Sequence, residues 1–446
     1  MSQTFFSVYA IAVFLCYLLI TAIVAHIIRA RNTENLLFNY YLPHFYWKIF
    51  FSTAFGVTYL LYYGGGDTTA YWEGAVKLNR LFYHSPQAYF TELFSTHNES
   101  SIYAPSYYSV ATVGKPPMWI YRDPNSWFVS KVASVFSFFT FESYLALNLL
   151  FGLISSWISW RFFRFTKQIT TINTRKIALA TLFIPSVGFW CGSLMKDTIV
   201  YCASLIGTMG FVQFSQQKFK QFGVTFFLLL SASYFLLHTR SFVFLALLVA
   251  FLALFIFKKY TGEYKIRNVI GRLLFLFIAG GLLLWYFSNA QEFGELSPDE
   301  LLKTASITQK DFQTNAIYTG KRYDIGEIDF SLIGLIKSAP AAIMTTFFKP
   351  FIWEASNPLM LLNGIENLLF SGLFLQFIRQ LITQRKVSIT QNNLIVFSFV
   401  FVLLMAFFVG ITSGLFGVLV RMKAGILVFF LIFLFSKSEE TISQPN

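Results

Sequence analysis

An aspartate stands where the chain leaves an apolar run. Asp67 follows three consecutive glycines in the sequence GGGDTTAYW. Glycines allow a tight turn and a close approach of the backbone to a ligand, and a carboxylate beside them could take a proton from a hydroxyl group. Tyr71, one turn further along an expected helix, would share this face and could contact a sugar. The alternative is that Asp67 caps the helix. A divalent cation could also bind such a carboxylate, but we predict no metal site.

Two cations and a second aspartate stand at the ends of later apolar runs. Lys196 and Asp197 open a run in GSLMKDTIVY, and Arg240 separates two runs in LLHTRSFVFL. A lysine at a helix N-terminus opposes the helix dipole unless an anion offsets it, and a phosphate group meets this condition. We therefore predict that Lys196 and Arg240 bind phosphate, with Asp197 in a supporting role. The alternatives are a helix cap for Asp197 and an interfacial cation for Arg240.

The segment KPFIWEASN places a proline, two charges and a tryptophan between apolar runs. Pro350 favours a break in the chain, and broken helices at membrane depth are tolerated where they line a cavity. Glu354 could accept a proton from a sugar hydroxyl, and Trp353 could stack on a sugar ring. Lys349 is predicted to support this carboxylate. The alternative is an aromatic belt at the membrane interface.

A further pair of cations lies inside an apolar run near the C-terminus. Arg421 and Lys423 occur in GVLVRMKAG, and a guanidinium group binds phosphate through two parallel hydrogen bonds. We predict phosphate binding for both residues, against the alternative of snorkelling side chains. Glu366 in the preceding run is predicted to form hydrogen bonds between helices. Arg122, in an aromatic-rich segment, is predicted to contact sugar.

The composition places these residues in a membrane protein. Hydrophobic residues make up 56% of the 446 residues, with a mean hydropathy of +0.58. Charged residues make up 12%, against about 25% in soluble domains. These values exclude a soluble enzyme and a nucleic-acid binder, and the net charge of +13 is typical of Lys and Arg gathered in cytoplasmic loops. The three cysteines lack metal-ligand spacing and are expected to be packing residues.

The apolar runs predict an all-α fold, a polytopic transmembrane helical bundle formed by a single integral membrane domain, residues 1–446. A span needs about 20 apolar residues, and the chain offers about eleven such runs, of which the shorter ones are expected to be half-spans. The predicted spans are 5–28, 45–63, 143–160, 177–194, 197–214, 222–238, 241–257, 273–288, 358–378, 394–412 and 420–436.

The orientation follows from the short basic loops, which all fall on one side if the N-terminus is outside. The C-terminal tail, 437–446, is then cytoplasmic, and Lys48 is assigned to a cytoplasmic loop. The first apolar run is expected to be a span and not a cleaved signal. Two long outer loops remain, 64–142 and 289–357, and short apolar pieces within them are expected to form re-entrant or interfacial helices.

Six segments follow one another in a recognisable order over residues 67–423: GDTTAY, PSVGFWCGSLMKD, HTRSFVFLA, KPFIWEASN, GIENLL and GVLVRMKAG. In this order they resemble segments of bacterial polytopic proteins of the exopolysaccharide and O-antigen repeat-unit polymerase group. Two positions depart from that pattern: no Pro or His follows Arg240, and Lys423 stands where a second Arg is more usual. The wider similarity is to membrane glycosyltransferases of the GT-C type.

The resemblance implies a reaction on a glycan linked to a polyprenyl phosphate or diphosphate, at the outer face of the cytoplasmic membrane. Cations would hold the phosphate and stabilise the leaving group, and Asp67 or Glu354 would take the proton of the acceptor hydroxyl. The partners implied are the polyprenyl-linked glycan, membrane lipid and other envelope-assembly proteins, with no nucleic acid. The resemblance implies no nucleotide or redox cofactor.

Two other functions remain open from the sequence. A transporter or flippase of an anionic or lipid-linked substrate would also need outer cations and broken helices, although the chain shows no pair of similar halves. An accessory subunit of a cell-envelope complex would use the same polar residues as contacts to its partners.

Overall fold

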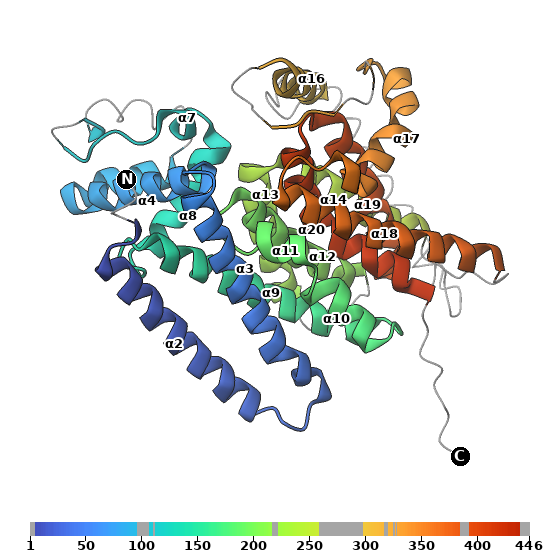
Figure 1. Cartoon of the computed structure of the whole chain (residues 1–446), viewed down its shortest axis with the longest axis horizontal. Helices are drawn as coiled ribbons and strands as arrows, with labels where there is room; N and C mark the ends of the chain where they lie inside the picture. The colour runs from blue at the N-terminus through green and yellow to red at the C-terminus, as the bar shows by residue number, and fades with distance from the viewer. Residues whose placement is uncertain are drawn as a thin grey trace. The chain divides into compact units, whose positions relative to one another are not determined.

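The chain folds into α-helices throughout the part that the computed structural model describes. These residues are 5–95, 107–109, 112–215, 222–257, 298–315, 320–323, 326, 328–383 and 392–437. No strand is assigned within these ranges, so the predicted all-α class is confirmed there (Figure 1).

Six described helices are long and apolar enough to cross a membrane. They are α2 (Val8–Ala30), α9 (Tyr144–Ile169), α12 (Lys196–Ser215), α18 (Pro358–Thr383), α19 (Asn393–Thr412) and α20 (Phe416–Leu434). The other helices are η1 (Leu36–Tyr40), α3 (Tyr41–Leu61), α4 (Asp67–His84), α5 (Pro86–Phe94), α7 (Met118–Tyr121), α8 (Pro124–Ser137), α10 (Thr174–Leu182), α11 (Pro185–Trp190), α13 (Phe222–Thr239), α14 (Ser241–Phe257), α16 (Pro298–Thr314), α17 (Leu332–Phe348), η4 (Ile352–Glu354) and η6 (Phe435–Lys437).

Two predictions about the spans are wrong in detail. The run 177–194 is not one helix: α10 ends at Leu182 and α11 starts at Pro185, because proline cannot donate the backbone hydrogen bond that would continue α10. Lys48 lies in the interior of α3 and not in a loop, because α3 begins at Tyr41. The predicted span 273–288 and residues 438–446 of the predicted tail lie outside the described residues.

The chain divides into two compact units, which are described separately below. Unit 1 comprises residues 1–168, 174–210 and 221–244. Unit 2 comprises residues 169–173, 211–220 and 245–446.

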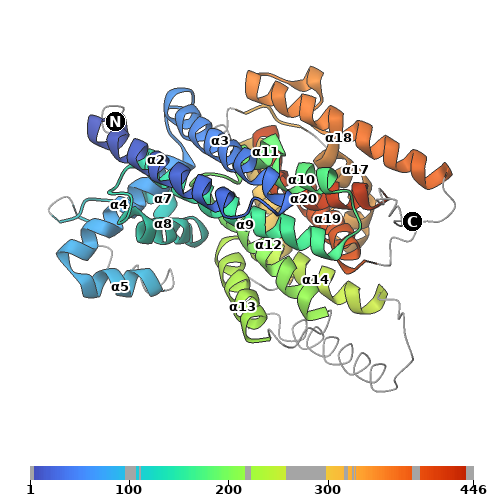
Figure 2. The ribbon, with the colours of Figure 1, turned by 90° about the horizontal axis from the view of Figure 1, so that it is seen from below.

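In unit 1, the first long segment forms helices, of which α4 and α8 pack side by side (Figure 2). A Cβ atom built on Gly74 would lie 2.6 Å from Ser130 Oγ, and the Ser134 hydroxyl lies 2.7 Å from the Asn79 amide group. Both contacts pair residues about 55 positions apart in the same order. The N-termini of α4 and α8 therefore lie at the same end of the pair.

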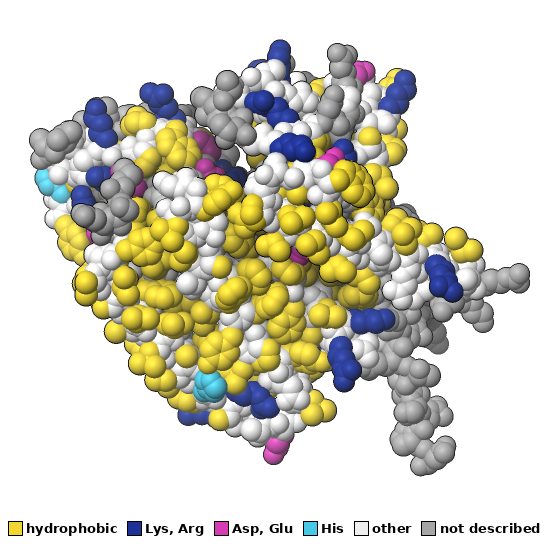
Figure 3. Space-filling view, viewed as in Figure 1, with side chains coloured by type: hydrophobic (Ala, Val, Ile, Leu, Met, Phe, Trp, Pro, Cys, Tyr) yellow, Lys and Arg dark blue, Asp and Glu magenta, His cyan; other side chains and the backbone are white. Residues whose placement is uncertain are grey.

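The long helices α2 and α9 of unit 1 also begin at this end. Ser143, just before α9, donates to Ala10 O at the start of α2, at 3.0 Å. Helix α3 runs antiparallel to α9, since Ser52 Oγ donates to Asn148 O at 2.8 Å while Lys48 meets Ser155. Hydrophobic side chains cover α2 and α3 on the face shown in Figure 3. This apolar surface is what a helix exposes to lipid.

In unit 2, α17 and α19 pack closely at a glycine. A Cβ built on Gly410 would lie 2.3 Å from Ala342 O, and Thr346 Oγ1 donates to Ala406 O at 2.7 Å. The Phe347 and Phe430 rings stack with centroids 4.2 Å apart, which joins α20 to α17. Small residues allow this approach, as in other membrane helix pairs.

We expect Gly410→Ala to destabilise the protein by about 1–3 kcal/mol, because the added methyl group must push α17 and α19 apart. The control is Gly417→Ala on α20, where a Cβ meets nothing within 4 Å and alanine favours the helix. Thermal unfolding in detergent micelles compares the two. Equal unfolding temperatures would contradict the close packing.

Candidate functional site

Arg240 and Asp197 form a buried ion pair in unit 1. Arg240 Nη2 lies 2.7 Å from Asp197 Oδ1, and the two side chains are 11% and 3% exposed. Arg240 is the single residue between α13 and α14, and its backbone NH and CO close the end of one and the start of the other. Asp197 lies in the first turn of α12, where the helix dipole favours a negative charge. The pair therefore fixes the guanidinium group at the N-terminus of α12.

Lys196 forms a second, looser pair with Asp123. Its Nζ lies 3.3 Å from Asp123 Oδ2, and Asp123 is 44% exposed. Asp123 caps α8, accepting from the Asn125 NH at 3.2 Å and from the Ser126 hydroxyl. Burial raises the pKa of the Asp123 carboxyl, but Lys196 and these hydrogen bonds lower it by more, so that the pKa lies below its ordinary value. The carboxylate stays charged and keeps the ammonium group of Lys196 in place.

The structure brings Asp67 to the same region. It is the first residue of α4, and the parallel packing of α4 and α8 places it at the end where Asp123 caps α8. A chain of hydrogen bonds also runs from α4 towards α12. The Thr68 and Tyr144 hydroxyls are 3.2 Å apart, Asn148 Nδ2 donates to Tyr144 O at 3.0 Å, and Leu194 N donates to Asn148 Oδ1 at 3.0 Å.

We refer to Asp67, Asp123, Lys196, Asp197 and Arg240 as the charged cluster. It unites three residues predicted as chemically active with a predicted supporting residue, Asp197, and with Asp123, which the prediction missed. Arginine has five N–H donors, so one carboxylate contact leaves donors for a second anion. The cluster thus combines two positioned cations, a helix N-terminus and a partly exposed carboxylate.

The two predicted sugar-binding residues of unit 1 behave differently. Tyr71 is only 2% exposed, so its ring packs inside the unit and offers no surface for stacking in this conformation. Arg122 is exposed and follows α7, next to Asp123. Arg122 therefore remains available for a ligand contact.

In unit 2, Glu354 is held by its own segment. Its Oε1 lies 3.5 Å from Lys349 Nζ, and its Oε2 accepts from the Phe351 NH at 2.7 Å. Lys321, which was not among the predicted site residues, donates to Glu354 O at 2.8 Å. With both carboxylate oxygens in contact with donors, Glu354 is better placed to orient this segment than to remove a proton.

Trp353 beside it is 78% exposed, and its ring stacks on Phe351 with centroids 4.8 Å apart and an interplanar angle of 17°. This geometry suits both a sugar platform and an interfacial anchor.

The predicted phosphate site at Lys423 is not supported. Lys423 is 1% exposed, and its Nζ donates to Lys349 O at 2.7 Å and to Asn367 Oδ1 at 2.8 Å. Asn367 Nδ2 in turn donates to Pro350 O at 2.9 Å. Lys423 therefore joins α20 and α18 to the break after α17. Glu366 is buried, and its charge interacts with that of Lys423; the hydrogen bond predicted for Glu366 between helices stays a prediction. Arg421 is partly exposed, and phosphate binding by this residue also stays a prediction.

The first long segment also holds a buried carboxylate that was not among the predicted site residues. Glu92 on α5 is 3% exposed and accepts from Trp127 Nε1 of α8 at 2.7 Å. Burial raises the pKa of this carboxyl, and the Trp127 hydrogen bond and the charge of Lys131 offset only part of the effect. Glu92 lies on a short amphipathic helix, and nothing in the sequence indicates that its hydrogen-bond partner is the indole of Trp127.

This raised pKa predicts a pH-dependent stability. The protonated form of Glu92 stabilises the fold, so its contribution is complete below the ordinary pKa of 4.5 and is lost as the pH rises through the folded-state pKa. We expect Glu92→Gln, which stays neutral, to unfold at a higher temperature than wild type near pH 7 and at the same temperature near pH 4. Half-exposed Glu73, changed to Gln, is the control. A pH-independent difference would contradict the assignment.

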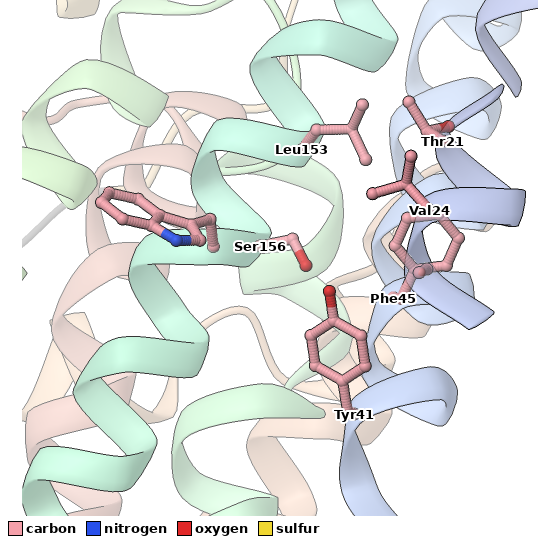
Figure 4. A pocket seen from close by; sticks show the side chains of 8 residues that line it. Thr21, Val24, Tyr41, Phe45, Leu153 and Ser156 are labelled. Atoms are coloured by element: carbon pink, nitrogen blue, oxygen red, sulfur yellow. The ribbon is translucent and has the colours of Figure 1, made fainter. Parts of the chain in front are cut away.

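A pocket of about 180 Å³ lies between α2, α3 and α9 in unit 1 (Figure 4). Its lining is mostly apolar and includes Phe45 and Leu153, with Thr21, Tyr41 and Ser156 as polar members. No predicted site residue lines it. Within the described ranges, no group of three or more His, Cys, Asp or Glu side chains is arranged to hold a metal ion.

Comparison with known proteins gives no relative: no family model, no curated protein and no solved structure matches the chain.

Proposed function

We propose that the protein is a membrane glycosyltransferase or polysaccharide polymerase that acts on a polyprenyl-phosphate- or diphosphate-linked glycan. The observation that carries the proposal is the charged cluster, in which Lys196 and Arg240 are fixed at the N-terminus of α12 while Asp67 lies at the same end of unit 1. Positioned cations stabilise a departing phosphate, and a nearby carboxylate can serve as the general base.

In the proposed reaction, the bond between the anomeric carbon of the donor sugar and the phosphate oxygen breaks. Its electron pair leaves with the polyprenyl diphosphate, whose charge Arg240 and Lys196 stabilise. The acceptor hydroxyl oxygen forms the new bond to the anomeric carbon, and its proton passes to Asp67. The looser of the two ion pairs, Lys196–Asp123, is the one that the diphosphate would open.

The topology that goes with this proposal has about eleven spans in the cytoplasmic membrane, with the N-terminus outside and the C-terminus inside. Arg29 and Arg31 at the end of α2, and Lys167 near the end of α9, lie at the helix ends opposite the charged cluster. Basic residues favour the cytoplasmic side, and this preference supports an outer position for the charged cluster.

The proposal predicts that Asp67→Asn lowers the rate of glycan extension by about 10²–10⁴-fold, because a general base contributes that factor. The assay uses the full-length protein in proteoliposomes with a polyprenyl-diphosphate-linked repeat unit, and the product length is read by gel electrophoresis and mass spectrometry. Glu73→Gln on the same helix is the control and should extend at the wild-type rate. Wild-type extension by Asp67→Asn would contradict the role of Asp67.

A transporter or flippase of the same substrate is the second candidate, and the break between α10 and α11 is the observation that favours it, because discontinuous helices line transport sites. In the same proteoliposomes, a transporter would move the labelled repeat unit across the bilayer without lengthening it.

A further inference from the structure

Two ionisable residues lie one turn apart in the interior of α3. His44 is 0% exposed and Lys48 is 1% exposed. Among the residues that the structure describes, no carboxylate forms an ion pair with either side chain. Buried charges without an opposite charge are costly, and ionisable groups within apolar helices usually serve a function. The pair belongs neither to the charged cluster nor to its chemistry.

Both ring nitrogens of His44 face backbone carbonyl oxygens from different helices. Nδ1 lies 3.1 Å from Leu182 O, and Nε2 lies 3.2 Å from Ser156 O. A neutral imidazole has one N–H donor and one acceptor nitrogen, so it can satisfy only one of these carbonyls. The imidazolium form donates to both. Leu182 is the last residue of α10, where carbonyls lack helical partners and the dipole favours a cation.

Lys48 faces α9 and α12. Its Nζ donates to Ser155 Oγ at 3.0 Å and lies 5.2 Å from the centre of the Tyr201 ring. The titratable groups that face Lys48 are Tyr201, Cys191 and Cys202. None of them is a carboxylate. Two positive charges one turn apart repel each other, so protonation of one residue disfavours protonation of the other.

We propose that His44 and Lys48 form a proton-binding site inside unit 1, in which one shared proton holds α3 against α9 and the end of α10. When His44 carries the proton, it joins Ser156 O to Leu182 O. When His44 is neutral, one of these hydrogen bonds is lost and the end of α10, next to the break before Pro185, is held less firmly.

The test is the protonation state of His44, measured by ¹⁵N NMR on the full-length protein in lipid nanodiscs with labelled histidine. The chain has five histidines, so replacing the other four by Gln leaves a single signal. Burial and the charge of Lys48 lower the pKa of His44 to about 3, so we expect a singly protonated ring near neutral pH and a doubly protonated ring at the acidic end of a titration from about pH 3 to 8.

Lys48→Met supplies the second arm. Removing the neighbouring positive charge should raise the ratio of doubly to singly protonated His44 about tenfold at a fixed pH, whereas Lys48→Arg should leave this ratio near that of wild type. Amide hydrogen exchange of residues 174–182, corrected for intrinsic rates, should slow as His44 becomes protonated. A singly protonated ring with one fixed tautomer over the whole range in wild type would overturn the proposal, even if neither variant folds.

Discussion

Replacing Arg240 with alanine is expected to destabilise the protein by about 3–5 kcal/mol and to abolish glycan extension. The substitution leaves Asp197, 3% exposed, as a buried charge without the guanidinium group that lies 2.7 Å from it. Removing one partner of a buried ion pair has this cost. The loss of activity has a separate cause, since the departing diphosphate would lose one of its two cations.

Two variants separate these effects. The double variant Arg240→Gln with Asp197→Asn removes both charges and should recover most of the stability, because no buried charge remains unpaired, but it should stay inactive. Arg122→Ala removes an exposed cation of the same unit and should leave the unfolding temperature unchanged. The unfolding midpoint in detergent micelles and the extension assay give both readouts. A stable, active Arg240→Ala protein would contradict the assignment.

The second large effect is expected at Lys423. Changing it to methionine keeps most of the side-chain volume but leaves Lys349 O and Asn367 Oδ1 without their donor. Each buried acceptor left unpaired costs about 1–3 kcal/mol, so we expect the two together to cost about 2–6 kcal/mol. The segment that carries Glu354 should lose its fixed position as well.

Lys337→Met on α17 is the matched control, since that lysine is exposed. Limited proteolysis near residues 349–357 should become faster in Lys423→Met and not in Lys337→Met. If the two variants were equally stable, Lys423 would not hold this junction, and the phosphate-binding role predicted from the sequence would be open again.

The helices could be predicted from the sequence because long apolar runs have few other stable forms in a membrane. The predicted run 394–412 corresponds to α19, whereas the predicted run 177–194 is divided at Pro185 between α10 and α11. The position of Lys48 was predicted wrongly because a cation near the end of an apolar run was counted with the basic residues of the adjoining loop. Helix α3 starts at Tyr41, so that Lys48 lies two turns inside the helix.

The candidate site could be predicted only in part, for a physical reason. Lys196 and Arg240 are noticeable because a cation beside an apolar run needs an explanation. Asp123 can be recognised from the sequence as a helix cap, because it stands directly before Pro124. Its contact with Lys196 cannot be recognised in this way, because the two residues are 73 positions apart. Lys423 was wrongly predicted to bind phosphate because the sequence does not show what a cation in an apolar run faces. Such a cation can face lipid headgroups or, as here, a backbone carbonyl at the end of another helix.

The most direct test of the central claim is the fate of the lipid diphosphate. Purified full-length protein is incubated in proteoliposomes with a defined polyprenyl-diphosphate-linked repeat unit, and free polyprenyl diphosphate and glycan length are quantified together by mass spectrometry. Our account predicts one polyprenyl diphosphate released for each repeat unit added, and neither product from Arg240→Ala. Repeat units that cross the bilayer at unchanged length, with no diphosphate released, would contradict glycosyl transfer and favour transport.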